Sequence, residues 1–175
     1  MVERRSGGEK RHLSERAYHL NPGYVYFSSD NTAIRTVVGN SVAVCLWDKR
    51  LQQGGMNHFM YPSTKDVDRS TPKYGNVATV ALLRTMQQAG SQDKDLVAQI
   101  VGGAAYEKSI RGIGKKNISI ARRMLKKFDI PIISEDVGGE MGRKVIFDLE
   151  SGHLLVVKVH QIRKSDWVKD FPDEY

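Results

Sequence analysis

The sequence is poor in cysteine and in long apolar runs. Its 175 residues include one cysteine, Cys45, which excludes an internal disulfide. No stretch approaches the roughly 18 consecutive apolar residues that a membrane helix needs. The opening residues 1–16 carry charge without the apolar segment of a secretory signal. We therefore expect a cytoplasmic protein with no membrane insertion.

Clusters of metal ligands are also missing. The lone cysteine and the five histidines show no metal-ligand spacing, so we expect neither a metal nor a cofactor. Four of the histidines stand in no motif and are expected to be surface or packing residues: His12, His19, His153 and His160.

Acidic residues are outnumbered, which leaves a formal net charge of +7. The basic residues are dispersed, however, over residues 1–16, residues 122–127 and single sites. Neither an aromatic-interleaved basic motif nor zinc-finger spacing occurs, so we expect no nucleic-acid partner. An acidic protein partner accounts for the charge equally well.

The length and the composition fit one globular domain. Residues 1–20 are predicted to be a flexible basic arm, 21–160 the domain, and 161–175 a polar tail. Apolar spacing predicts a helix over residues 76–89, ended by Gly90, and a second helix that Asn117 caps. Alternating or continuous apolar runs predict strands at 24–28, 33–38, 42–47, 96–101, 130–134, 145–148 and 154–159. Helices interleaved with strands indicate an α/β layered sandwich with flanking helices.

The stretch 36–62 combines glycines with two chemically useful side chains. Ser41 stands where the strand 42–47 begins, and His58 lies on what reads as the next strand. If these strands pair in antiparallel fashion, the hydroxyl and the imidazole face each other as nucleophile and base. Gly54 and Gly55 are interpreted as backbone freedom close to a ligand. A serine or histidine beside glycine is also common in ordinary loops, so a structural role stays open.

The spaced motifs of this chain resemble those of the chemoreceptor glutamine deamidase (CheD) family. The match runs in order from Asn31 to Val159 and consists of GNSVAVCLWD, GGMNHFMYP, YGNVATVALLRTM, VGGAA, IGKKNISIARRML and IPIISEDVGGEMGRKVIFDLESG. The resemblance implies a single-domain α/β sandwich that hydrolyses glutamine side-chain amides on methyl-accepting chemotaxis proteins to glutamate and ammonia. It also implies a second partner, a CheC-type phosphatase.

The resemblance further implies a catalytic cysteine, histidine and threonine. The histidine matches His58, and the threonine matches Thr36, with Thr32 as the alternative. The cysteine position falls on Ser41, and Asn40 replaces the serine that usually precedes it. The chain therefore departs from the family at the nucleophile.

A serine is a weaker nucleophile than a cysteine in such a site. A thiol of pKa about 8.5 ionises readily beside a histidine, whereas a hydroxyl needs a well-aligned base and usually an orienting carboxylate. Three interpretations of Ser41 stay open: an introduced replacement of cysteine that traps an inactive form, a natural variant that only binds partners, and a working serine amidase. Cys45 is a substitute nucleophile in principle, but its apolar strand neighbours favour an inert buried thiol.

Overall fold

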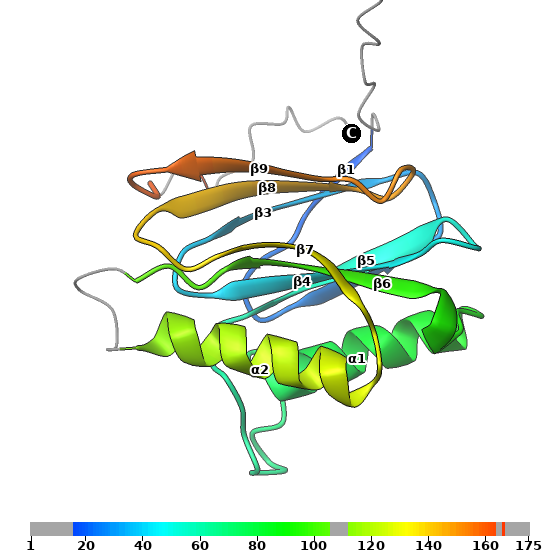
Figure 1. Cartoon of the computed structure of the whole chain (residues 1–175), viewed down its shortest axis with the longest axis horizontal. Coiled ribbons are helices and arrows are strands. Elements are labelled where there is room, and N and C mark those ends of the chain that lie inside the picture. Colours follow the sequence, from blue (N-terminus) through cyan, green and yellow to red (C-terminus); the bar gives the residue numbers. More distant parts are fainter. Residues whose placement is uncertain (1–15, 106–111, 164–165, 167–175) are drawn as a thin grey trace, which may run out of the picture.

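Residues 16–105, 112–163 and 166 are described in the computed structural model of the chain. In these residues two sheets stack face to face, and two α-helices cover the outer face of one of them (Figure 1). The predicted α/β sandwich is confirmed, with both helices on the same side rather than on opposite faces. The helices and the sheet next to them hold the larger part of the polypeptide's apolar core.

The first sheet has the strand order β1-β3-β8-β9. Its strands are β1 (Ala17–His19), β3 (Ala33–Val38), β8 (Gly142–Asp148) and β9 (Leu154–Val159). β1 runs parallel to β3, and the other neighbours are antiparallel. The predicted hairpin of the last two strands is therefore confirmed.

The second sheet has the order β2-β5-β4-β6-β7. It consists of β2 (Val25–Ser28), β5 (Gln53–Phe59), β4 (Val42–Asp48), β6 (Leu96–Gly102) and β7 (Ile132–Val137). Only the β6–β7 pair is parallel among these neighbours of the described chain. β4 is central and covered on both faces, which explains its almost unbroken apolar sequence.

Helices α1 (Gly75–Gln88) and α2 (Ile113–Lys127) form the third layer, with a short 3-10 turn, η1 (Asp93–Asp95), after α1. α1 ends as predicted: Gly90 adopts φ +94°, its N–H donates to the Gln87 carbonyl, and the Ser91 N–H donates to Met86. The predicted cap of α2 is wrong. The helix begins at Ile113 after Gly112, so Asn117 lies inside it and is fully buried.

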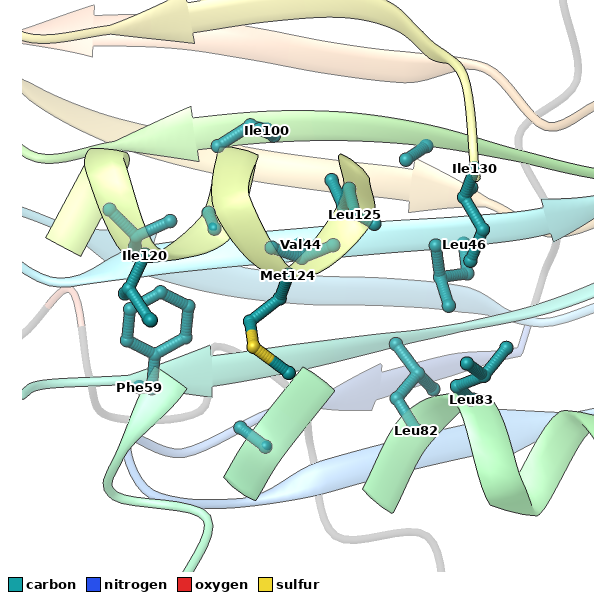
Figure 2. Packing of buried hydrophobic residues seen from close by; sticks show 14 of the residues in the cluster. Val44, Leu46, Phe59, Leu82, Leu83, Ile100, Ile120, Met124, Leu125 and Ile130 are labelled. Atoms are coloured by element: carbon teal, nitrogen blue, oxygen red, sulfur yellow. The ribbon is translucent and has the colours of Figure 1, made fainter. Parts of the chain in front are cut away.

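Two hydrophobic clusters hold the layers together. One fills the space between the helices and β4, β5 and β6, and includes Phe59, Ile120 and Leu46 (Figure 2). The other lies between the sheets and includes Ala43, Cys45 and Met56. Side chains alternate along β4 between these two clusters, as the pleat of a strand requires.

The glycine pair serves the packing of a strand. Gly54 and Gly55 lie inside β5, not in a loop before it. A Cβ on Gly54 would sit 2.6 Å from the Leu46 carbonyl oxygen, and one on Gly55 would sit 2.5 Å from that of Tyr26. Any larger residue would force the neighbouring strands apart, so the interpretation of the pair as part of a loop is wrong.

The described secondary structure begins before the predicted boundary at residue 21. β1 occupies part of the predicted basic arm, and Leu20 is fully buried between the sheets. The rest of that arm, residues 1–15, lies outside the described residues. Among the described residues no helix combines the length and the apolar character needed to cross a bilayer.

Candidate functional site

Strand pairing brings Ser41 and His58 together. In the β4–β5 ladder Val42 is opposite Phe59, and Ala43 is opposite His58. Ser41 precedes β4 by one residue and so lies diagonal to His58 on the same face. Its Oγ is 2.7 Å from His58 Nε2. The two side chains predicted to face each other therefore do so, as a diagonal pair.

The third member of the group comes from the other sheet. Thr36 on β3 places its Oγ1 2.9 Å from His58 Nδ1 and donates a 2.8 Å hydrogen bond to the Leu20 carbonyl. Thr32, the alternative threonine, precedes β3, and its carbonyl accepts from the Leu149 N–H. Four residues of extended chain, roughly 13 Å, separate the two threonines. The structure thus brings Thr36, and not Thr32, to His58.

The hydrogen bonds fix the tautomer of the histidine. The Leu20 carbonyl can only accept, so the single proton of the Thr36 hydroxyl points to it, and the hydroxyl oxygen accepts from His58 Nδ1–H. A neutral imidazole protonated at Nδ1 carries a lone pair on Nε2, which accepts from the Ser41 hydroxyl. The imidazole is therefore aimed at Ser41 as a base.

Burial keeps that imidazole neutral. His58 is 0% exposed, Thr36 2% and Ser41 7%. Burial, followed by electrostatic repulsion from His19, lowers the pKa of His58 to about 3, although the Leu20 carbonyl acts in the opposite direction. Ser41 is the most exposed of the three, so a reacting group from outside would meet the site at Ser41.

Cys45 does not belong to this group. Its side chain is 1% exposed and belongs to the cluster between the sheets, opposite Met56 in the ladder. Burial raises the pKa of the thiol well above its ordinary range. The expected burial of this thiol is confirmed.

A glycine turn after β6 holds the loop that carries Ser41. The Gly103 N–H donates to the Ser41 carbonyl and the Ala104 N–H to the Gly39 carbonyl, each at 2.8 Å. Gly102 adopts φ +113°, and a Cβ there would collide with the Ser41 carbonyl oxygen. These glycines serve close packing, and the packing supports the loop of the candidate nucleophile.

Charged residues elsewhere in the described chain have structural or surface roles. Arg143 is buried and donates to the Asp136 carboxylate at 2.9 Å and to the carbonyls of Gly138 and Met141 at 2.8 Å. The basic residues of α2 are exposed, and Arg122 pairs with Glu135 at 2.8 Å. No group of three or more potential metal ligands occurs in the described part of the chain.

Sequence reasoning missed two residues of the site. Leu20 supplies the carbonyl that fixes the Thr36 hydroxyl, and nothing in a leucine predicts such a main-chain role. Asn117 donates to two carbonyls beside the site. A signal for it was present in the sequence. Asn117 lies three residues before Ile120 and four residues from both Ile113 and Ala121, in a stripe that is otherwise apolar.

A buried imidazole lies between two hydroxyls, and the Ser41 hydroxyl is the more exposed of the two. A hydroxyl or thiol within reach of a histidine base is a feature of acyl-transfer hydrolases. Comparison with known proteins gives the family. The model of the CheD family, described as chemotactic sensory transduction, matches residues 60–158. The chain belongs to the CheD family.

Individual relatives agree over most of the chain. A probable chemoreceptor glutamine deamidase CheD from Trichlorobacter lovleyi is 39% identical over 81% of this chain and 89% of its own length. A relative of the same name from Sulfurimonas denitrificans is 35% identical over 82% of this chain and 94% of its own. The similarly named protein of the archaeon Methanococcus vannielii is 36% identical over 75% and 88%.

Proposed function

We propose that this chain is a chemoreceptor glutamine deamidase by descent and architecture. It would hydrolyse side-chain amides of glutamines on methyl-accepting chemotaxis proteins, giving glutamate and ammonia. The observation that carries the proposal is the hydrogen-bonded chain from Ser41 through His58 to Thr36 in a member of the CheD family. Because the proposed substrates are receptor segments on the inner side of the membrane, a cytoplasmic location follows for the chain.

In the first half of the reaction, the Ser41 oxygen attacks the amide carbon of the substrate glutamine. His58 Nε2 takes the hydroxyl proton and then delivers it to the amide nitrogen, which leaves as ammonia. The products of this half are ammonia and an ester between Ser41 and the substrate carbonyl. The 2.7 Å contact between Oγ and Nε2 is within the range that such a proton transfer needs.

In the second half, water attacks the ester carbonyl while His58 removes its proton. The ester bond breaks, the proton passes to the Ser41 oxygen, and the substrate leaves as glutamate. Throughout, Thr36 holds the ring with Nδ1 protonated, so that Nε2 is the nitrogen that exchanges protons.

The serine makes this reaction slow. A base whose pKa is about 3 has little power to deprotonate an alcohol, and the neutral Thr36 offers no negative charge to stabilise the imidazolium that forms. A thiol in the same place loses its proton far more easily. We therefore propose that the Ser41 form is impaired and that a cysteine at this position would give full activity.

The second candidate function is a binding module without catalysis, which regulates a CheC-type phosphatase or a receptor. Ser41 favours it, because replacement of the nucleophile removes chemistry and leaves the surface of the domain intact. The two functions predict different behaviour toward the same receptor.

The test is to incubate a receptor cytoplasmic fragment with the chain and with its Ser41→Cys variant, and to map converted glutamines by mass spectrometry. Conversion of particular glutamines by Ser41→Cys supports the deamidase. If Ser41→Cys converts no glutamine while the chain retains a receptor fragment or a CheC-type phosphatase in a pull-down, the binding module is supported instead.

A further inference from the structure

Asn117 is a polar residue in the apolar face of α2. It is 0% exposed and lies among buried neighbours of the same helix, with Ile118, Ile120 and Ala121 close in sequence. Its Oδ1 is buried and has no hydrogen-bond partner among the described residues. An unsatisfied buried acceptor costs stability, so the side chain is poorly explained by packing alone.

The amide nitrogen of Asn117 joins the two segments that carry the candidate nucleophile and base. It donates at 3.0 Å to the Asn40 carbonyl and at 2.9 Å to the Met60 carbonyl. Asn40 precedes Ser41, and Met60 follows His58 by two residues and β5 by one. Both amide protons are used, one on each side of the Ser41–His58 pair.

The bond to Asn40 also sets the direction of the Ser41 N–H. The Asn40 carbonyl and the Ser41 N–H belong to one planar trans peptide, in which the two groups point in opposite directions. Because Asn117 draws the carbonyl toward α2, the N–H of Ser41 points away from α2. The backbone N–H of an attacking residue is a frequent donor to the oxyanion that its attack creates.

The first turn of α2 is itself fixed against the same loop. A Cβ on Gly114 would sit 2.8 Å from the Ala104 carbonyl oxygen, so this turn touches the segment whose N–H groups hold Gly39 and Ser41. Close backbone packing therefore fixes the helix turn that carries Asn117. Through its two hydrogen bonds, the Asn117 amide in turn fixes the backbone next to Ser41 and the backbone that follows His58.

We propose that Asn117 is a positioning residue, which holds the Ser41 loop in register with His58 and aims the Ser41 N–H at the oxyanion. The part of the proposal that concerns the oxyanion rests on the proposed deamidase function. The register of Ser41 with His58 does not, because it exists in the chain without substrate. The two parts can therefore be tested separately.

The test compares two matched pairs of substitutions in the full chain. Asn117→Leu and Asn117→Asp keep the shape of the side chain and remove its N–H donors. Gln99→Met and Gln99→Glu remove the N–H donors of another buried amide, which donates to the Gly152 carbonyl at 2.8 Å and not to a backbone group beside Ser41 or His58. Having two variants at each position allows for one that fails to fold.

The first measurement is the ¹⁵N resonance of His58 Nε2 without substrate. This resonance depends on the hydrogen bond that the nitrogen accepts. We expect it to shift in the Asn117 variants and to stay in place in the Gln99 variants, even if both pairs lose similar stability to urea. An unchanged resonance in a folded Asn117 variant would overturn the proposed register.

The second measurement is ammonia release from a receptor fragment, with every variant built on Ser41→Cys. A misplaced reacting atom costs roughly 100-fold in rate, so kcat should fall about that much for both Asn117 variants, with KM unchanged and the Gln99 variants unaffected. An equal loss at Gln99, or a change in KM alone, would overturn the positioning role. If Ser41→Cys itself releases no ammonia, the deamidase proposal fails, and the resonance still decides the register.

Discussion

The hydroxyl of Thr36 lies 2.9 Å from Nδ1 of His58 and joins the two sheets at the candidate site. The hydroxyl donates its single proton to the Leu20 carbonyl, so its oxygen can only accept a hydrogen bond from the imidazole ring. It therefore fixes the tautomer, as an aspartate does in serine hydrolases, without supplying the negative charge. The arrangement gives a well-aimed but weak base, which suits a thiol better than an alcohol.

Replacing Thr36 tests its part in this arrangement. Thr36→Val keeps the shape and removes the acceptor for Nδ1–H, so the ring is free to change tautomer or to rotate. We expect kcat for ammonia release in the Ser41→Cys background to fall about 10²-fold, with a loss of about 1–3 kcal/mol in the free energy of unfolding. Thr36→Ser keeps the hydroxyl and should retain most of the activity. Equal activity of the valine and serine variants would contradict the role.

The pKa of His58 predicts how stability depends on pH. The folded state holds the pKa near 3, below the ordinary 6.5, so the unfolded chain binds the proton more readily. The contribution of His58 is complete above pH 6.5 and is lost as the pH falls toward 3, with a slope that approaches about 1.4 kcal/mol per pH unit. Urea unfolding from pH 7 to pH 4 measures it.

The control for this pH dependence is His58→Gln, which has no imidazole to protonate. Its free energy of unfolding should vary less with pH over the same interval, whatever its absolute value. If the chain and the variant show the same slope, the imidazole is not protected from protons in the folded state.

Cys45 should be protected from alkylation while the chain is folded. The thiol is 1% exposed, and burial raises its pKa, so both access and ionisation are reduced. Iodoacetamide should label it only at urea concentrations that unfold the chain. In Ser41→Cys, native labelling should therefore map to residue 41. Rapid labelling of Cys45 under native conditions would contradict this prediction and would make Cys45 a candidate nucleophile again.

Gly55→Ala tests the packing interpretation of the glycine pair. The new methyl group would meet the Tyr26 carbonyl at 2.5 Å and a Leu82 methyl at 2.6 Å, between β2 and α1. We expect Gly55→Ala to lower the free energy of unfolding by about 1–3 kcal/mol more than the control substitution Gly138→Ala does. At Gly138 no atom lies within 4 Å of the added Cβ, and only its φ of +76° is unfavourable. Thermal unfolding of both variants checks this.

Strands that follow a simple pattern were predictable from the sequence. β3 occupies the range 33–38 that its alternation predicts, and β4 exceeds its predicted range by one residue. The Ser41–His58 pair followed from the same reasoning, since antiparallel neighbours with a short connection place their ends together.

Relations between distant layers were not predictable in this way. Thr36 reaches His58 from the other sheet, and no local pattern states which sheets stack; only the family resemblance pointed to it. Asn117 has the local preference of a helix cap, but the helix begins four residues earlier, and the amide is used for tertiary hydrogen bonds instead. Gly55 likewise meets atoms of β2 and α1, whose closeness no local rule gives.

The central claim is that residue 41 and His58 form the reacting pair of a glutamine deamidase. Its most direct test is ammonia release from a receptor fragment by Ser41→Cys, beside the Ser41→Cys, His58→Ala double variant, both carrying Cys45→Ala to remove the other thiol. We predict activity in the first, well above that of the Ser41 chain, and a loss of at least about 10²-fold in the second. Equal rates in the two, or no release by the first, would contradict the account.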